Sequence, residues 1–584
     1  MRRKYSLLHL IPYLRKYRIK LGFGFVMVLC TIVASMITPW VLKYVVDDIQ
    51  AAFAPEKLPR YAAFILGLSA IEGFFRFWMR KILIGVSRDI EYDLRNDFFA
   101  HLQRLSLSFF QSNSTGDVMS RATNDLNAVR SVLGPGIMYS VTTVVTVVAA
   151  TAILFRLNWK LTLLAYIPLV LAAAGVKRVG HQIHDRFESI QEQFSHISTR
   201  VQENLAGIRV VKAFARENRE IEIFRELNED YVRRSVSLIR LWGIFYPMMS
   251  ALIGLSAVAL LWYGGREVIN GKLTLGEFVA FLGYLSMLTW PTIATGWVIN
   301  IFERGAASMD RILRILEAEP EIQDTPACSA PSPVRGTLEI RNLSFHYPNS
   351  ERQVLHGINL TVPAGQTLAI VGQTGSGKST LVNLILRLFD PPPGTVFIDG
   401  RDIRRWPLAA LRKVLGYVPQ ETFLFSDTIR GNIAFGKEAG ISDQEAEWAT
   451  RTSAIDTDIK GFPQGLQTFI GERGITLSGG QKQRVAISRA VTKAPKILIL
   501  DDSLSSVDTY TEERILLGLK EMMKDRTTIL VSHRISTVKE AHQIIVLQEG
   551  RIVEHGTHET LMARDGAYAA LYQKQLLEDE LATA

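Results

Sequence analysis

The sequence predicts an all-helical membrane domain of six long transmembrane helices with cytoplasmic extensions, followed by a soluble α/β domain of the P-loop type. Of the 584 residues, 48% are hydrophobic and only 21% are charged, which suits a chain partly dissolved in lipid. Long apolar runs fill the first 300 residues. From about residue 336, short strands, helices and turns follow, among them a glycine-rich loop. A chain of this length is also too long for a single hydrophobic core.

Six stretches are long enough to cross about 30 Å of hydrocarbon as helices, which takes roughly 20 residues each. They lie near residues 20–46, 60–83, 135–155, 160–178, 242–263 and 276–300. The polar segments between the second and third stretches, and between the fourth and fifth, have helical period and are too long for ordinary loops. Their Lys and Arg residues predict helices that continue into the cytoplasm, with short connections on the other side.

The charged residues indicate which partners to expect. The net charge of +9 is compatible with nucleic acid, but many Lys and Arg residues flank the hydrophobic stretches, where positive charge marks the cytoplasmic side. We therefore expect a multi-pass protein of the cytoplasmic (inner) membrane with no nucleic-acid partner, its N-terminus and soluble domain in the cytoplasm. The first 20 residues predict a basic amphipathic helix on the inner membrane surface, with an organelle transit peptide as the alternative.

Two polar or aromatic pairs stand out inside the predicted spans. Glu72 and Arg76 lie near the middle of the second span at i,i+4 spacing, where pairing lowers the cost of holding charge in lipid. A structural ion pair facing a wet cavity is favoured slightly over a substrate contact. Trp290 and Trp297 share one face of the last span, and packing on neighbouring helices is favoured over a ligand site.

A linker separates the two parts of the chain. The segment "EAEPEIQDTPACSAPSPVRG" is rich in Pro, Ala and acidic residues and has no period. We therefore expect a membrane domain at 1–316, a linker at 317–336 and a soluble domain at 337–580, which the motif quoted next makes a nucleotide-binding domain.

The segment "GQTGSGKST" matches the phosphate-binding loop G-x-x-x-x-G-K-[ST] and lies between an apolar strand and a helical pattern. Its glycines let backbone amides turn towards phosphates, Lys378 reaches the β- and γ-phosphates, and Ser379 binds Mg²⁺. A glycine-rich turn without nucleotide is the disfavoured alternative. The predicted ATP-contacting residues of the loop are Gly372, Gln373, Thr374, Gly375, Ser376, Gly377, Lys378, Ser379 and Thr380.

The run "ILILDDSLSSVD", residues 497–508, predicts a buried strand that ends at two carboxylates. Downstream of a phosphate loop, the first of these, Asp501, is expected to hold Mg²⁺ directly or through water. The second, Asp502, occupies the position from which a carboxylate would act on the attacking water.

The segment "LSGGQ" precedes a second helical pattern, and a helix N-terminus offers free amides and a favourable dipole to an anion. One fold cannot easily place both this segment and the phosphate loop on the same phosphate. With these motifs the chain resembles, over essentially its whole length, a half-size exporter of the ATP-binding cassette (ABC) family, with the type IV exporter fold. The resemblance implies that the signature residues complete the ATP site of another subunit; they are Ser478, Gly479, Gly480 and Gln481.

The resemblance implies roles for four further residues. Tyr347 in "FHYP" is similar to the aromatic that stacks on adenine, and Gln420 in "YVPQ" to the glutamine near Mg²⁺ and the attacking water. His533 in "LVSH" resembles the switch histidine at the γ-phosphate, and Asp508 in "SSVD" the D-loop aspartate that communicates between two sites.

The resemblance also implies segments that connect the two domains. Glu472 in "IGERG" is similar to an exporter-specific residue that faces helices reaching down from the membrane. The segments 114–125 and 203–217 resemble the two coupling helices that dock on the ATPase domains.

Asp502 departs from the family pattern, in which Glu usually follows the magnesium aspartate. The shorter side chain withdraws the carboxylate by about 1.5 Å, and a displacement near 1 Å reduces rate about 100-fold. The site is therefore expected to bind ATP and hydrolyse it slowly. The surrounding sequence resembles the Asp-bearing subunits of bacterial heterodimeric multidrug exporters, whose partner supplies the catalytic Glu, although His533 is retained.

The resulting expectation is an ATP-hydrolysing translocase that uses ATP and Mg²⁺. It would export amphipathic compounds across the cytoplasmic membrane as one half of a heterodimeric multidrug exporter, contributing a degenerate ATP site beside a partner with a catalytic Glu. A homodimeric lipid or lipopolysaccharide flippase is the alternative. A non-transporting ABC ATPase acting on nucleic acid or ribosomes is a remote alternative, because six spans disfavour it.

Overall fold

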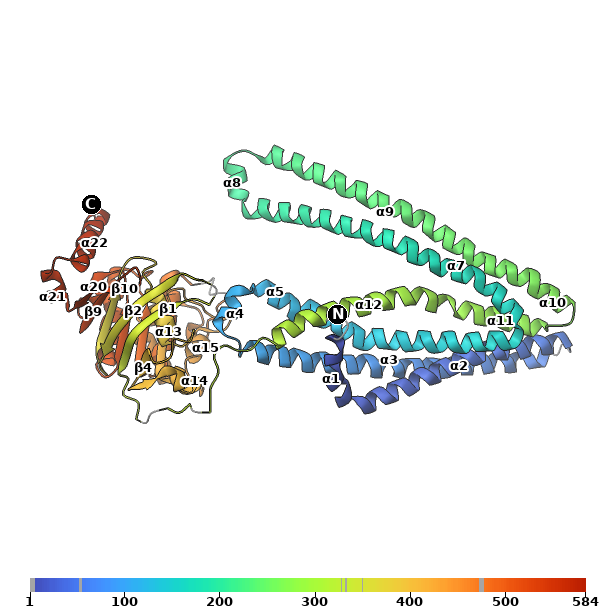
Figure 1. The fold of residues 1–584 in the computed structure, drawn as a ribbon, viewed down its shortest axis with the longest axis horizontal. Coiled ribbons are helices and arrows are strands. Elements are labelled where there is room, and N and C mark those ends of the chain that lie inside the picture. The colour runs from blue at the N-terminus through green and yellow to red at the C-terminus, as the bar shows by residue number, and fades with distance from the viewer. Residues whose placement is uncertain are drawn as a thin grey trace. The chain divides into compact units, whose positions relative to one another are not determined.

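The computed structural model describes residues 6–51, 55–326, 328–330, 333–348, 350–471 and 477–583. The chain forms two compact units (Figure 1). Unit 1 comprises Met1–Leu102 and Gly116–Glu317, and unit 2 comprises Gln103–Thr115 and Ala318–Ala584. Glu472, which the sequence assigned to a contact with the membrane helices, lies outside the described residues.

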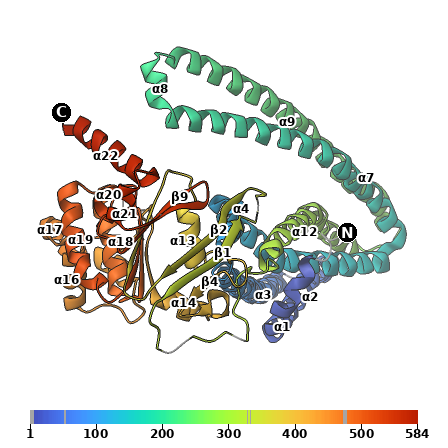
Figure 2. The ribbon, with the colours of Figure 1, turned by 60° about the vertical axis from the view of Figure 1, so that its left-hand side comes forward.

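Unit 1 is helical throughout its described residues. Its α-helices are α1 (Ile11–Lys16), α2 (Arg18–Ala51), α3 (Leu58–Leu102), α5 (Thr115–Ser120), α6 (Leu126–Ser131), α7 (Ile137–Ala206), α8 (Ile208–Ala213), α9 (Glu217–Ala259), α10 (Gly265–Ile269), α11 (Leu275–Met287) and α12 (Thr289–Leu316). Short π-helical turns join α5 to α6, α6 to α7 and α9 to α10. The long helices α7 and α9 lie side by side (Figures 1 and 2).

Five helical stretches among the described residues are long and apolar enough to cross a membrane. They are Arg18–Ala51, Pro55–Leu102, Thr115–Pro168, Glu217–Ile269 and Leu275–Leu316. The third and fourth predicted spans lie almost entirely in α7, on either side of Asn158, and the single stretch Thr115–Pro168 takes in the third span and the first part of the fourth. Several side chains of the fourth predicted span, 160–178, lie outside the described residues.

Asn158 divides α7 into two helices. Its backbone is extended (φ −159°, ψ 104°), and its side-chain oxygen accepts a hydrogen bond from Leu161 N at 3.0 Å. A short polar side chain that bonds the amide three residues on is the usual start of a helix, because it satisfies a donor that lacks an intrahelical partner. The polar residue thus makes the short turn that the sequence predicted between the third and fourth spans.

The exterior of the unit 1 helices is apolar. Buried residues such as Val28, Leu154 and Phe281 form a core between helices, while Leu66 and Val148 are more than 60% exposed. Exposed apolar surface of this extent is unfavourable in water and neutral in hydrocarbon. Helices also satisfy their own backbone hydrogen bonds, which hydrocarbon demands.

The start of α11 is clamped onto α2. Gly276 N donates a hydrogen bond to Asp47 Oδ1 at 2.7 Å, and Lys43 pairs with Glu277 at 2.9 Å. A Cβ atom at Gly276 would overlap the Lys43 carbonyl and the Asp47 carboxylate. The backbones of α2 and α11 are therefore closer at Gly276 than a residue with a side chain would allow.

Unit 2 contains two sheets. The four-stranded sheet has the order β2-β1-β4-β5 and the six-stranded sheet the order β10-β9-β3-β8-β7-β6. The strands are β1 (Leu338–His346), β2 (Gln353–Val362), β3 (Thr367–Val371), β4 (Val396–Ile398), β5 (Arg401–Asp402), β6 (Leu415–Val418), β7 (Ile497–Asp501), β8 (Thr527–Val531), β9 (Gln543–Gln548) and β10 (Arg551–Gly556).

The described α-helices of unit 2 surround these sheets. They are α4 (Leu107–Ser112), α13 (Lys378–Ile385), α14 (Leu408–Val414), α15 (Ile429–Ala434), α16 (Asp443–Thr452), α17 (Asp456–Gly461), α18 (Gly479–Thr492), α19 (Thr509–Met523), α20 (Ile535–Val538), α21 (His558–Ala563) and α22 (Ala567–Thr583). In Figure 2, α16, α18 and α19 lie on the side of the six-stranded sheet away from β1, β2 and β4.

The central strands are buried on both faces, as parallel strands between two layers must be. In β7, Leu498 and Leu500 pack towards the helical layer, whereas Ile497 and Ile499 pack towards β1, β2 and α13. β3, β8 and β7 are parallel neighbours, so their carboxyl ends meet at one edge of the sheet. Chemistry at this edge is the general rule for open parallel sheets.

The first connecting segment differs from its prediction. The sequence placed it at 114–125, whereas unit 2 takes in 103–115, which contains α4. Ser108 Oγ of this segment donates a hydrogen bond to Glu321 Oε2 at 2.6 Å. Residues 116–125 form α5 and a π-helical turn of unit 1 instead. The second predicted segment, 203–217, contains α8 and belongs to unit 1.

We expect Gly276→Ala to destabilise the protein, because the new methyl group forces α11 away from α2. Overpacking of this kind costs about 1–3 kcal/mol. The measurement is the Tm of the detergent-solubilised protein. Gly67→Ala is the matched control, because Gly67 lies in the exposed face of α3 with nothing within 4 Å of its Cβ position. Equal Tm values for both variants would contradict the close approach.

Candidate nucleotide-binding site

The loop after β3 depends on glycine. Gly372, Gly375 and Gly377 have φ values of 152°, 82° and 102°, where residues with a side chain are strained. A Cβ at Gly372 would also overlap the Leu547 carbonyl. Glycine at these three positions therefore allows the loop to turn its backbone amides inwards without strain.

Two polar groups of the loop are poised for an anion. Ser376 Oγ is buried and has no hydrogen-bond partner among the described residues. Lys378 Nζ donates to the loop's own carbonyls, Gly372 O at 2.9 Å and Gln373 O at 2.8 Å. Burial lowers the pKa of Lys378 from its ordinary value. An orphaned hydroxyl and a desolvated ammonium both suit phosphate oxygens, so the loop fits the phosphates of ATP.

The loop lines a cavity of about 1050 Å³. Twelve of the residues predicted from the sequence line it: Gly372, Gln373, Thr374, Gly375, Gly377, Lys378, Ser379, Thr380, Gln420, Asp501, Asp502 and His533. The lining does not include Tyr347, Ser376 or the four signature residues. The structure thus gathers the predicted phosphate, metal and hydrolysis residues around one cavity.

Asp501 ends β7 as a buried carboxylate beside the loop. Ser379 Oγ donates to Asp501 Oδ1 at 3.5 Å. Burial raises the pKa of Asp501, and the neighbouring charge of Asp502 raises it further. A buried carboxylate next to a serine hydroxyl, in a cavity that the Gln420 amide also lines, offers the oxygen ligands that Mg²⁺ prefers.

Among the residues that the structure describes, no group of three His, Cys, Asp or Glu side chains is placed to hold a metal ion. Mg²⁺ commonly binds through one or two carboxylates, water and substrate phosphates. The donor set of Ser379, Asp501 and Gln420 therefore fits Mg²⁺ that arrives with a nucleotide, and such an ion would neutralise phosphate charge.

Asp502 is held by both of its carboxylate oxygens. Oδ1 lies 2.7 Å from His533 Nδ1, and Oδ2 accepts a hydrogen bond from Gln420 Nε2 at 3.3 Å. Its backbone is left-handed (φ 46°), and its amide donates to Val531 O at 2.8 Å. A strained conformation held by several bonds is typical of functional positions. Asp502 is therefore in direct contact with the other two residues predicted to act in hydrolysis.

Tyr347 lies beside the helix that follows the phosphate loop. Its hydroxyl is 3.0 Å from Thr380 Oγ1, and its ring makes edge-on contact with Phe389 at 5.1 Å between centroids. These contacts fix the orientation of a half-buried ring. Stacking on adenine stays a prediction.

The signature segment starts α18 with a capping box. The Ser478 side chain accepts from Gln481 N, and Gln481 Oε1 accepts from Ser478 N at 3.0 Å. Gln481 Nε2 also donates to Asp458 Oδ1 at 2.8 Å. The reciprocal bonds fix the first turn of the helix and leave other amides at its start free to face an anion.

The D-loop is bonded to the signature helix. Gln483 Oε1 accepts from Ser506 N at 3.1 Å, and Gln483 Nε2 donates to Ser505 Oγ at 3.3 Å. Asp508 caps α19 by accepting from Thr511 N at 2.9 Å, and hydrogen bonding from Thr511 lowers the pKa of Asp508. The signature and the D-loop therefore form one hydrogen-bonded piece.

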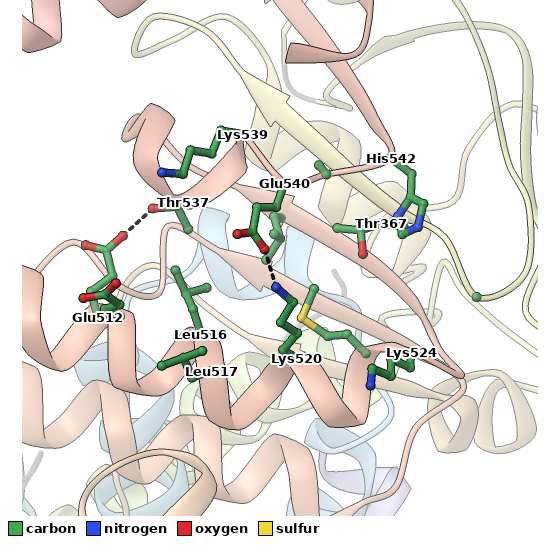
Figure 3. A pocket seen from close by; sticks show the side chains of 15 residues that line it. Thr367, Glu512, Leu516, Leu517, Lys520, Lys524, Thr537, Lys539, Glu540 and His542 are labelled. Atoms are coloured by element: carbon green, nitrogen blue, oxygen red, sulfur yellow. Dashed lines mark hydrogen bonds and ion pairs between the residues drawn. The ribbon is translucent and has the colours of Figure 1, made fainter. Parts of the chain in front are cut away.

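Arg534 was not predicted from the sequence and connects the switch to the D-loop. Its guanidinium pairs with buried Glu512 at 2.5 Å and donates to Val507 O at 3.3 Å. Glu512 also accepts from Thr537, as Figure 3 shows on one wall of a second cavity, of about 520 Å³. Lys520 and Glu540 pair across that cavity at 2.9 Å. In the sequence, only its position directly after His533 marks Arg534 as part of the site.

Other lining residues of the nucleotide cavity also escaped prediction. They are Val354, Val371, Val531, Ile535, Leu571, Lys574 and Gln575. The last three belong to α22, near the end of the chain, and no local motif marks them.

We expect the pKa of His533 to exceed its ordinary value of 6.5, because hydrogen bonding to Asp502 favours the protonated imidazole. The ion pair is then complete below pH 6.5 and is lost as the pH rises through the raised pKa. Hydrogen–deuterium exchange at histidine C2, followed by mass spectrometry of the nucleotide-free full-length protein, measures this pKa. Asp502→Asn should lower it, since burial then opposes protonation without the carboxylate. A wild-type value at or below 6.5 would contradict the pairing.

Comparisons with known proteins cover both parts of the chain. Residues 21–292 match the family "ABC transporter transmembrane region", and residues 355–505 match the family "ABC transporter". The chain is 38% identical over 568 residues to the probable multidrug resistance ABC transporter ATP-binding/permease protein YheI of Bacillus subtilis (strain 168), covering 97% of each protein. It is 36% identical over 559 residues to the ATP-dependent lipid A-core flippase of Syntrophus aciditrophicus (strain SB), covering 95% of this chain and 92% of the flippase.

A solved structure gives the same result for the fold. A bacterial Atm1-family ABC exporter with ATP bound matches with a TM-score of 0.79 and 30% identity, over 96% of this chain and 98% of the exporter. The helical membrane region and the α/β domain both agree with this match. The chain therefore belongs to the ABC transporter family, as a half-transporter of the exporter type in which a transmembrane region is fused to an ATP-hydrolysing domain.

Proposed function

We propose that the chain is one half of a heterodimeric exporter that moves amphipathic compounds outward across the cytoplasmic membrane and hydrolyses ATP slowly at its own site. The observation that carries this proposal is the short carboxylate of Asp502. Both of its oxygens already bond to His533 and Gln420. The Asp502 carboxylate stops about 1.5 Å short of the position from which a glutamate would reach a water molecule in line with a γ-phosphate.

The proposed roles follow from charge and position. Lys378 binds the β- and γ-phosphates, while Ser379 and Asp501 hold Mg²⁺, which offsets phosphate charge when bound. Asp502 accepts the proton of the attacking water, Gln420 orients that water, and His533 donates a hydrogen bond to the γ-phosphate. The signature segment completes the site of the partner subunit, whose own glutamate would make that site the faster one.

A cavity of about 600 Å³ in unit 1 supports an amphipathic cargo. Its walls combine hydroxyl groups with thioethers and an indole. The hydroxyls are Thr31, Ser35, Thr38, Thr142, Thr143, Thr146 and Ser286, and the larger apolar groups are Met79, Met138, Met287 and Trp290. Flexible methionines adapt to many shapes, and scattered hydroxyls satisfy polar groups without selecting one.

The Glu72–Arg76 ion pair, predicted from i,i+4 spacing, is formed and lines this cavity. Trp297 packs on Tyr139, with ring centroids 5.2 Å apart, while Trp290 lines the cavity. The pair therefore serves as a charged wall of the cavity, and Trp290 as an apolar wall.

A homodimeric lipid or lipopolysaccharide flippase is the second candidate. The cavity holds two arginines, Arg76 and Arg80, against the single acid Glu72, which suits an anionic headgroup. The similarity to a lipid A-core flippase supports the same assignment. ATPase assays in nanodiscs distinguish the two candidates: a flippase responds to one lipid class, and a multidrug exporter to many unrelated amphiphiles.

The proposed topology places the N-terminus and the ATPase domain in the cytoplasm. The helices long enough to span a membrane leave little support for a non-transporting ATPase.

We expect Asp502→Glu to raise ATP hydrolysis by the assembled transporter while leaving nucleotide affinity unchanged. In a heterodimer the rate rises at most about twofold, because the partner's site already carries the turnover. In a homodimer the rise is up to about 100-fold, because both sites gain the longer carboxylate. Steady-state phosphate release and ATP affinity are the measurements. Unchanged turnover with intact binding would contradict a catalytic deficit at Asp502.

We expect the complex extracted gently from its own membrane, with this chain tagged at native expression, to contain two unequal half-transporters. Native mass spectrometry measures the subunit masses directly. A complex with one subunit mass would instead make slow homodimeric export or lipid flipping the leading function.

A further inference from the structure

The switch segment after β8 is held from two sides. On one side, Arg534 and Thr537 bond Glu512 of α19. On the other side, the amide of Ile535 donates to Gln575 Oε1 of α22 at 2.7 Å. His533 itself contacts Asp502. Apart from the contact between His533 and Asp502, none of these bonds involves a residue assigned to hydrolysis.

The amide of Ile535 needs an external acceptor. It belongs to the first turn of α20, whose N-cap, Arg534, makes no side-chain cap. The first amides of a helix have no intrahelical partner. Ile535 is buried, so water is a poor substitute. Because α20 has only four residues, it has little intrinsic stability with which to hold the switch.

The helix that supplies the acceptor is itself firmly anchored. Glu554 of β10 accepts hydrogen bonds from Ala567 N at 2.8 Å and Tyr568 N at 2.9 Å, at the start of α22. Tyr568 is fully buried, and its hydroxyl lies 2.8 Å from His558 Nδ1. Two turns further on, Gln575 reaches the switch. Because α22 is anchored to the sheet through Glu554, it holds Gln575, the acceptor of the Ile535 amide, in place.

We propose that Gln575 is a positioning residue for ATP hydrolysis: by holding the amide of Ile535, it keeps His533 in contact with Asp502 and directed into the nucleotide cavity. This assignment deepens the proposed function and rests on the hydrolytic role given there to His533. Leu571 and Gln575 also line the cavity, so the anchor lies close to the chemistry.

The test removes the acceptor and preserves the size of the side chain. Gln575→Leu has no acceptor, and Gln575→Glu keeps a carboxylate oxygen that restores most of the contact. Gln573→Leu is the matched control, because it makes the same change at an exposed position of the same helix. The full-length complex is used throughout, with Tm measured for every variant.

The first measurement is the pKa of His533 by C2-hydrogen exchange, which requires no catalysis. The charged groups that face the imidazole are Asp502, Arg534 and Lys378, and only Asp502 raises its pKa. We expect Gln575→Leu to lower the pKa, because a released switch loses contact with Asp502. Gln573→Leu should stay close to wild type, and Gln575→Glu, which keeps an acceptor for the Ile535 amide, should not lower the pKa. A wild-type pKa in Gln575→Leu would overturn the proposal.

The second measurement is kcat in the Asp502→Glu background, where turnover at this site is visible. We expect Gln575→Leu to remove most of the increase in kcat that Asp502→Glu gives, with unchanged KM for ATP, since displacement of a catalytic group by less than 1 Å lowers turnover at this site about tenfold. A raised KM with unchanged kcat would overturn the positioning role. If Asp502→Glu fails to raise turnover, the proposed slow site is wrong, whereas the exchange measurement still decides the role of Gln575.

Discussion

The parallel register of β3, β8 and β7 is the constraint on which the nucleotide site depends. Leu368 pairs with Ile529, and Asp501 pairs with Val531, so the three strands end together. Each strand is buried on both faces, and a slip by one residue would exchange the side chains of the two layers. The apolar core therefore sets the position of the phosphate loop, the aspartate pair and the switch, and leaves these polar segments free for chemistry.

The two units are suited to different solvents: unit 1 to hydrocarbon and unit 2 to water. In unit 1 the backbone is satisfied within helices and the apolar surface faces outwards, as hydrocarbon requires. In unit 2 the apolar residues point inwards, and the buried carboxylate of Glu512 is paired with the half-buried guanidinium of Arg534. The close contact of Gly276 with α2 shows a further consequence of lipid: small residues, and not hydrophobic burial, bring helices together there.

Much of this could be predicted from the sequence, because the strongest signals are local. The phosphate loop, Asp501 at the end of its strand and the Glu72–Arg76 pair each depend on residues within a few positions of one another. The predictions failed, or could not be made, where packing between distant segments of the chain determines the structure. The first connecting segment was placed at 114–125, since helical period does not show where one long helix bends into α4. The bond from Ile535 to Gln575 joins residues 40 positions apart, and no pattern in either segment announces it.

The break at Asn158 has a mechanical consequence. On one side of this residue the chain turns within a few atoms, and on the other side helix runs on to Ala206. At a rise of 1.5 Å per residue this arm is about 70 Å long. A rotation of about 10° at Asn158 would therefore sweep the far end through about 12 Å, which is roughly two turns of helix. A bend at this single asparagine would therefore turn a small change of angle into a large displacement of the far end of the helix.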